Sequence, residues 1–406
     1  MVIKTAMSQG SFTADGGYRD LYFGDLLDFF NKSNKRVVIV GHVLNSYNKF
    51  VKCLKRNPTS CLFSIEQLLG IPDIVYCFLK ALAMFYTKAF ALQPVRPFRG
   101  IDMGAVVYDA VVEELKSSQY LVNLMNVQST QRILQRNDVD RFILPFENRG
   151  WERLDMMALR TYSKRTRIIG YQHASISQKH TEYFRSPDDK LPLPDVIVSM
   201  GEITARMLVE RGKFPAAIVK VGCALRQEWS FAENNAAPRD PANLLVCLST
   251  SADYYERTIA SLNDILRNAD GLTIRLRAHP LIPLKDSLKS KIAFSWHADV
   301  ESGDEKSLDW ADVVLYSSST TLALNGLQRG KPVFYVPVDD YLDSDPLFEL
   351  SDAKWIVRTS KEFQKALTDL RGMEPARWKA ALAGTQRYVK RYFGLVSPIT
   401  MTPFLA

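Results

Sequence analysis

One stretch, residues 272–337, constrains the fold more than any other part of the chain. It begins with LTIRLRAHP and ends with ADVVLYSSSTTLALNGLQRGKPVFYVP. The short apolar runs are typical of buried parallel strands, and each leads into polar residues or a helix. In an open α/β sheet, ligands bind beyond the carboxyl ends of the strands. The stretch therefore predicts a parallel sheet with a ligand site at that edge.

The polar residues that follow these strands are suited to hold a phosphate. The Ser/Thr run places hydroxyl groups beside free backbone N–H groups at a helix start, where an anion is stabilised. The histidine at the end of the neighbouring strand adds a further donor. We therefore expect a nucleotide phosphate at this edge, and the residues concerned are His279, Pro280, Ser317, Ser318, Ser319 and Thr320.

The length of 406 residues suits two domains, and strands alternate with helices through most of the chain. We expect α/β architecture, with two doubly wound, Rossmann-like domains facing across a cleft. Residues 229–243, WSFAENNAAPRDPAN, are polar and without periodicity, so they are the best linker candidate. The predicted domains cover residues 1–230 and 231–374, and a basic amphipathic helix begins the last segment, 375–406. Residues 1–35 are expected to form a polar lead and one amphipathic helix.

Charge and cysteine content restrict the partners and the compartment. The net charge of +8 and the pI of about 9.1 favour an acidic partner, such as a nucleotide or a phospholipid surface. Nucleic acid is disfavoured, because the basic residues form no stripe interleaved with aromatic residues. The five cysteines have no CxxC spacing, which indicates a reducing compartment, and the first residues lack the apolar core of a secretory signal.

Residues 74–92 are apolar for about 19 positions but contain Lys80 and Lys88. A central lysine costs about 2.5–3.5 kcal/mol on insertion scales, so a spanning helix is disfavoured. A helix lying in the membrane interface, with its lysines reaching the headgroups, is one alternative. We expect a buried or groove-facing helix instead.

Two consecutive strands of the first domain end in ionisable side chains, Glu147 and His173. A carboxylate at a strand end beside a cleft is placed to act as a general base, and burial would raise its pKa. The histidine is expected to contact substrate or to serve in acid–base chemistry. In the alternative, Glu147 caps the next helix or pairs with a neighbouring arginine. Further residues expected to bind substrate are Asn148, Glu152, Arg153, Gln172 and Arg277.

Several well-known site types have no signature in this sequence. There is no GxGxxG or GxxxxGK[ST] motif for a dinucleotide or a P-loop phosphate, and no GxSxG or HExxH motif. The acidic run of Asp339, Asp340, Asp343 and Asp345 is better explained as a solvated loop than as a cation or ribose site. We therefore expect no metal site.

The order of the motifs resembles that of a known enzyme group. FENRGWER, followed by IGYQHASIS and an MGE helix start, resembles bacterial surface-carbohydrate biosynthesis proteins of the GT-B glycosyltransferase type. The later RAHP and SSSTTLALNG are similar to the HP and SS motifs of GT-B enzymes that use CMP-activated sugars, namely the sialyl-, polysialyl- and Kdo-type transferases. The resemblance covers roughly residues 140–340.

The resemblance implies a cytosolic, membrane-associated glycosyltransferase that needs no metal and no cofactor beyond its nucleotide-sugar donor. The donor would be a CMP-linked 2-keto-3-deoxy acid bound by the second domain. The acceptor, a capsule or lipopolysaccharide glycan or its lipid-linked precursor, would bind the first, with Glu147 or His173 as base. The last helix would cross back to the first domain.

One departure and two alternatives accompany this expectation. Many GT-B enzymes carry an acidic, ribose-binding residue in the helix after the SS motif, and this chain reads TTLALNG there. A UDP-, GDP- or CDP-linked glycosyl or polyol-phosphate transferase is therefore an alternative. A non-catalytic protein that binds a nucleotide or a glycan is the other.

Overall fold

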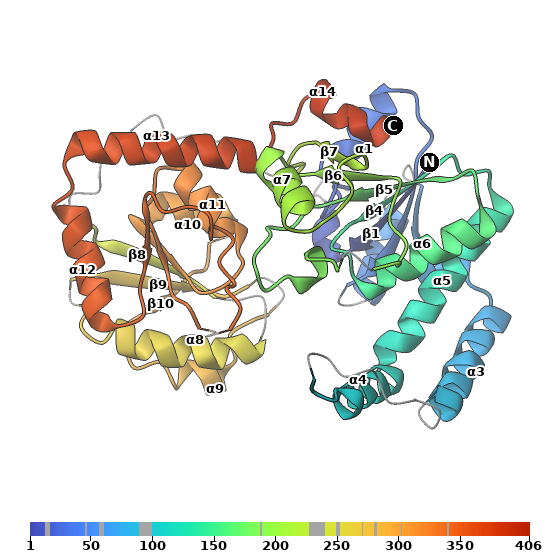
Figure 1. The fold of residues 1–406 in the computed structure, drawn as a ribbon, viewed down its shortest axis with the longest axis horizontal. Coiled ribbons are helices and arrows are strands. Elements are labelled where there is room, and N and C mark those ends of the chain that lie inside the picture. Colours follow the sequence, from blue (N-terminus) through green and yellow to red (C-terminus); the bar gives the residue numbers. More distant parts are fainter. Residues whose placement is uncertain are drawn as a thin grey trace.

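The computed structural model contains two α/β domains side by side (Figure 1). Each domain is built on a parallel sheet, because its buried, β-branched strands are separated by amphipathic helices. The two domains confirm the predicted fold class. The structure describes residues 1–12, 17–44, 47–56, 61–88, 100–186, 189–226, 240–248, 252–269, 271–279, 282–301, 303–338 and 341–406. The proposed linker, 229–243, lies largely outside them.

The first domain holds a seven-stranded parallel sheet in the order β3-β2-β1-β4-β5-β6-β7. Glu147 and His173 follow the carboxyl ends of two of its neighbouring strands. The strands are β1 (Val2–Met7), β2 (Val38–Val43), β3 (Leu62–Ser64), β4 (Arg141–Pro145), β5 (Arg167–Tyr171), β6 (Val196–Ser199) and β7 (Val219–Val221). Its helices are α1 (Leu26–Lys32), α2 (Tyr47–Arg56), α5 (Ser118–Arg136), α6 (Gly150–Tyr162) and α7 (Glu202–Glu210).

The expectation of a polar lead at the N-terminus is wrong, because Val2–Met7 forms β1, which lies inside the sheet between β2 and β4. Lys4 makes this strand hard to predict from the sequence, since a lysine rarely points into a core. Here its ammonium is fully buried and donates to Asp155 Oδ1 at 2.7 Å and to Thr130 Oγ1 at 2.8 Å. The buried ion pair makes a central strand possible for this sequence.

The second domain holds a six-stranded parallel sheet in the order β10-β9-β8-β11-β12-β13. In this domain α10 and α11 lie on one side of the sheet, and α8 and α9 lie on the other (Figure 1). The strands are β8 (Asn243–Cys247), β9 (Thr273–Arg277), β10 (His297–Ala298), β11 (Val313–Tyr316), β12 (Val333–Tyr335) and β13 (Lys354–Ile356). The helices are α8 (Ala252–Ile265), α9 (Asp286–Lys289), α10 (Asp304–Trp310), α11 (Thr321–Gln328) and α12 (Ser360–Arg371).

The last helices connect the two domains. The long helix α13 (Pro375–Tyr392) packs on α11 and reaches α7, and α14 (Pro398–Met401) lies on the first domain (Figure 1). The hydroxyl of Tyr392 accepts a hydrogen bond from the Ile176 N–H at 2.9 Å. A Cβ on Gly201 would lie 2.3 Å from the Tyr392 carbonyl oxygen, so only glycine permits this close approach.

Two helices, α3 (Ile71–Lys88) and α4 (Gly104–Lys116), extend away from the first sheet together with the first half of α5 (Figure 1). The expectation that residues 74–92 form a buried or groove-facing helix is wrong for the described part. Among the described side chains of α3, only Asp73 and Cys77 are buried. Residues 89–92 lie outside the described part of the chain. None of the helices formed by the described residues combines the length and the apolar character needed to cross a membrane.

Candidate functional site

The Ser/Thr run follows β11 and begins α11, as the sequence predicted. Thr320 is the N-cap of α11, and its hydroxyl accepts a hydrogen bond from the Leu322 N–H at 3.2 Å. Ser317 is fully buried, and its hydroxyl lies 3.1 Å from that of Thr258. These two hydroxyls therefore fix the loop. The remaining N–H groups of the first turn are suited to an anion.

Ser318 differs from its neighbours in the run. Its side chain is 6% exposed, and its hydroxyl makes no hydrogen bond with any described residue. A buried hydroxyl without a partner costs about 1–3 kcal/mol, so such groups are rare unless a ligand or an ordered water serves them. Ser318 is the member of the run whose hydroxyl is available for a ligand oxygen.

His279 follows β9 and is half-buried beside α8. Its backbone N–H donates to the Tyr255 hydroxyl at 2.9 Å, which holds the turn after the strand. Burial lowers the pKa of His279, while Asp304 opposes that shift. The imidazole is therefore neutral at neutral pH. Pro280, the other half of the predicted motif, lies outside the described residues.

Arg277, which was predicted to bind substrate, contacts carboxylates of its own domain. Its guanidinium lies 2.6 Å from Asp299 Oδ2 and 2.8 Å from Asp304 Oδ1, and it donates to the Ser307 hydroxyl at 2.8 Å. The two carboxylates balance its charge in the free protein. This geometry gives Arg277 a structural function on the side of the sheet that carries α10.

In the first domain, Glu147 and His173 come together at the ends of β4 and β5, as expected from adjacent parallel strands. Glu147 Oε1 lies 3.5 Å from His173 Nε2, and Glu147 Oε2 lies 2.6 Å from Arg149 Nε. Burial raises the pKa of Glu147, and Arg149 partly offsets that rise. Burial also holds the pKa of His173 well below its usual range, so this ring is neutral. The pair joins a proton-accepting carboxylate to a neutral imidazole.

The residues after Glu147 form a tight turn into α6. Glu152 is buried and accepts hydrogen bonds from the N–H groups of Glu147 and Arg149, at 3.0 and 3.2 Å. Burial raises the pKa of Glu152 to about 8, whereas these N–H donors favour its ionised form. Asn148 adopts a left-handed φ of 61° and accepts from Arg153 Nε at 3.2 Å. In the free protein these three predicted substrate-binding residues shape the turn that presents Glu147.

Gln172 is also engaged within its own domain. It is fully buried, its side-chain oxygen accepts from the Met200 N–H at 3.3 Å, and its amide donates to the Ala174 carbonyl. These contacts tie β5 to β6 and orient the following residue, His173. Gln172 therefore supports the backbone next to His173.

Sequence reasoning missed Tyr22, whose ring centroid lies 4.3 Å from that of His173. Tyr22 also lines a cavity of about 350 Å³ at the carboxyl ends of β1, β2 and β4. Tyr22 precedes the first predicted strand, so nothing in the sequence linked it to His173. The other lining residues are Thr5, Ala6, His42, Val43, Leu44, Gln119, Val122, Asn123, Pro145 and Trp151.

His42, near the carboxyl end of β2, is one of these lining residues. Its ring lies 5.9 Å from that of Trp151, and burial together with the nearby Lys4 lowers its pKa to about 4. The cavity is mostly apolar, with neutral polar groups at its edge. Such a cavity suits a ligand group that is largely apolar.

The two halves of the site meet across the domains. The Ser175 hydroxyl, after β5, lies 3.0 Å from the Ser319 hydroxyl, after β11. The ammonium of Lys179 lies 3.7 Å from the ring centroid of Tyr254. The loops after β5 and β11 therefore touch, and this contact brings the domain that holds Glu147 and His173 against the Ser/Thr run.

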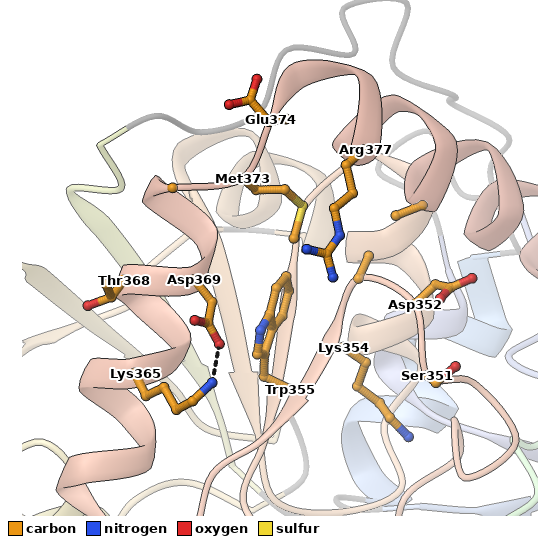
Figure 2. A pocket seen from close by; sticks show the side chains of 13 residues that line it. Ser351, Asp352, Lys354, Trp355, Lys365, Thr368, Asp369, Met373, Glu374 and Arg377 are labelled. Atoms are coloured by element: carbon orange, nitrogen blue, oxygen red, sulfur yellow. Dashed lines mark hydrogen bonds and ion pairs between the residues drawn. The ribbon is translucent and has the colours of Figure 1, made fainter.

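A second cavity, of about 590 Å³, is lined by residues from 351 to 381 (Figure 2). It surrounds the Trp355 side chain between α12 and the start of α13, and Arg377 points toward the indole (Figure 2). Lys354 and Asp352 stand at the beginning of β13, so the cavity lies at the opposite end of the sheet from Ser317. It belongs to neither half of the site.

No protein-family model and no curated protein matches this sequence. Solved structures match along the whole chain. The UDP-GlcNAc 2-epimerase from Neisseria meningitidis bound to UDP-GlcNAc is 9% identical with a TM-score of 0.54, and covers 100% of this chain and 99% of its own. The glycosyltransferase SnogD from Streptomyces nogalater is 12% identical with a TM-score of 0.52, covering 99% and 98%. MurG from Acinetobacter baumannii is 11% identical with a TM-score of 0.51, covering 95% and 94%.

The chain has the GT-B fold. Identities this low establish the architecture, and the chemistry has to be argued from the site. In this GT-B fold, the loops after β5 and β11 meet at the Ser175–Ser319 contact. Within the described ranges, no group of three His, Cys, Asp or Glu side chains is arranged to hold a metal ion.

Proposed function

We propose that the chain is a glycosyltransferase, which moves a sugar from a nucleotide-activated donor to a hydroxyl group of an acceptor. The observation that carries this proposal is the placement of Ser318 at the start of α11, with its buried hydroxyl unpartnered among the described residues. The Ser175–Ser319 contact joins that anion-binding turn to the domain that holds Glu147 and His173. A leaving phosphate and a proton acceptor therefore border one space.

In the proposed reaction, the acceptor occupies the cavity beside Tyr22, and its hydroxyl reaches Glu147. The acceptor oxygen forms a bond to the anomeric carbon, the bond from that carbon to the donor phosphate breaks, and Glu147 takes the hydroxyl proton. The phosphate leaves with the bonding electrons. The N–H groups at the start of α11 and the Ser318 hydroxyl stabilise its charge. Arg149, at 2.6 Å, holds Glu147 in position, and neutral His173 lies 3.5 Å from the other carboxylate oxygen.

Two donors are supported by different observations. The HP and SS motifs favour a CMP-activated 2-keto-3-deoxy sugar. The structural neighbours include an epimerase bound to UDP-GlcNAc and the protein TarM in complex with UDP, which supports a UDP-linked donor. The first turn of α11 has no acidic residue that could bind a ribose. This absence does not distinguish a CMP-linked donor from a UDP-linked one. For the acceptor we propose a surface glycan or its lipid-linked precursor, reached by peripheral contact with a membrane.

Calorimetric titration of CMP, CDP, UDP, UMP and GDP tests the donor site. We expect micromolar binding of one nucleotide by the wild type and at least tenfold weaker binding by His279→Ala. Binding of CMP alone would support the 2-keto-3-deoxy donor, and binding of UDP would support the alternative. Conversion of UDP-GlcNAc without any acceptor would indicate an epimerase. If no nucleotide binds, the proposed function is wrong.

A further inference from the structure

Many of the exposed large apolar side chains of the described surface lie on α3. Six of its large side chains are between 40% and 63% exposed, and we call them the arm face: Ile74, Val75, Tyr76, Phe78, Leu79 and Tyr86. Soluble monomers rarely expose a contiguous apolar patch of this kind without a partner. The helix has 18 residues, so it is about 27 Å long at 1.5 Å per residue.

Helix α3, which we call the arm, is fixed at its first turn, so it presents the arm face in a defined direction. Asp73, which is buried in the first turn, lies 2.5 Å from Arg132 Nη2 of α5 and accepts from Gln128 Nε2 at 3.0 Å. Its other oxygen accepts from the Gly70 N–H at 3.0 Å. These contacts hold α3 against α5, while the rest of the helix extends from the domain (Figure 1).

The charge of this segment identifies the partner. From residue 74 to residue 101 the sequence has four cations, Lys80, Lys88, Arg96 and Arg99, and no acidic residue. Of these, Lys80 is exposed on α3, whereas residues 89–99 lie outside the described part of the chain. A second copy of the chain would bring the same cations together, whereas an anionic lipid surface complements them. The acidic side chains Asp109, Glu113 and Glu114 are exposed on α4 and would be repelled by an anionic surface, so the inferred contact involves α3 and excludes α4.

The arm also adjoins the proposed acceptor cavity. Helix α5 packs against α3 and lines that cavity through Gln119, Val122 and Asn123. We propose that the arm face docks on an anionic phospholipid bilayer, with α3 lying in the boundary between headgroups and acyl chains. The docking itself follows from the arm, and only its purpose, to bring a lipid-linked acceptor to the cavity, rests on the proposed function.

Vesicle co-sedimentation of the full chain tests this proposal. The double variant Val75→Glu/Leu79→Glu places two carboxylates one turn apart on the arm face, where the native side chains are 49% and 58% exposed. The matched control is Val300→Glu/Ile399→Glu, whose native side chains are 86% and 83% exposed and lie outside the arm. We expect the wild type and the control to bind vesicles that contain phosphatidylglycerol, and the arm variant to bind at least about tenfold more weakly.

Three results would overturn the proposal: no vesicle binding by the wild type, equal binding by the arm variant, or a wild-type dimer that the arm variant abolishes. Binding that is unchanged on pure phosphatidylcholine would contradict the charge argument. Nucleotide titration of the same proteins separates this inference from the proposed function. Vesicle binding without nucleotide binding would support the docking surface and overturn the proposed transferase. Nucleotide binding without vesicle binding would support the proposed transferase and overturn the docking surface.

Discussion

The hydroxyl groups of Ser175 and Ser319 lie 3.0 Å apart, although 144 residues separate them along the chain. Ser175 follows β5 of the first domain, and Ser319 belongs to the proposed phosphate-binding run of the second. A phosphate that contacts Ser319 therefore acts on the same hydroxyl that joins the domains. In the proposed function, we therefore expect donor binding to affect the contact between the domains through this side chain.

Replacement of Ser175 separates closure from donor binding. We expect Ser175→Ala to lower kcat by about 2–10-fold, the equivalent of one hydrogen bond, with a nearly unchanged nucleotide Kd. Ser163→Ala, which removes a hydroxyl that contacts Thr166 far from the site, is the control and should change neither quantity. Steady-state kinetics and calorimetry measure the two effects. An equal loss in Kd would place Ser175 in the donor site itself.

Ser318→Ala is expected to change stability and binding in opposite directions. Removal of a buried hydroxyl that has no described partner should raise the free energy of unfolding by about 1 kcal/mol. Loss of a contact to a charged phosphate should weaken nucleotide binding by about tenfold. Denaturant unfolding and calorimetry report the two quantities. A variant that is less stable and binds normally would show that Ser318 serves the fold alone.

Glu147→Gln tests the proposed base. Because the general base contributes about 10²–10⁴-fold, we expect a loss of that size in kcat with nucleotide binding retained. In the wild type, burial raises the pKa of Glu147, and only its ionised form accepts a proton. The value of kcat/KM should therefore fall as the pH decreases through that raised pKa. The variant should lack this acidic limb, whereas Glu202→Gln, which removes an exposed carboxylate paired with Arg391, should keep it.

His42 should make the protein sensitive to moderate acid. Its pKa is about 4 in the folded state and about 6.5 when exposed, so the unfolded chain binds more protons between these values. Stability therefore decreases as the pH falls from about 6.5 to about 4, by at most on the order of 3 kcal/mol from this group. Thermal unfolding across this range should show a smaller decrease for His42→Gln. An identical decrease would mean that other groups control the acid response.

The parallel strands were predictable wherever the apolar run was uninterrupted. The uninterrupted apolar runs VVLY and VFY located β11 and β12, and the alternation of apolar and basic residues in TIRLR located β9. It failed at β1, because Lys4 and Thr5 interrupt the apolar pattern. The compensating carboxylate, Asp155, lies 151 residues further along the chain. No local pattern reveals such a partner.

The candidate site could be predicted from the sequence only where its residues follow recognisable strands. Glu147 and His173 were expected together because adjacent parallel strands bring their ends to one edge, and the structure places them 3.5 Å apart. Tyr22 and the cavity it lines were not expected, since they depend on how a segment before the second strand folds back. The exposure of α3 was also missed. An apolar helix in a core and one at a membrane interface have the same composition.

The place of β1 inside the sheet has a consequence for synthesis. Val2 pairs with Phe142 of β4, so the ribosome must add about 140 residues before one side of this strand finds its partner. At about 5–20 residues per second, the nascent chain carries an incomplete β-sheet for at least several seconds. An unpaired strand edge is prone to aggregate, so we expect the nascent chain to be bound by chaperones that recognise apolar segments.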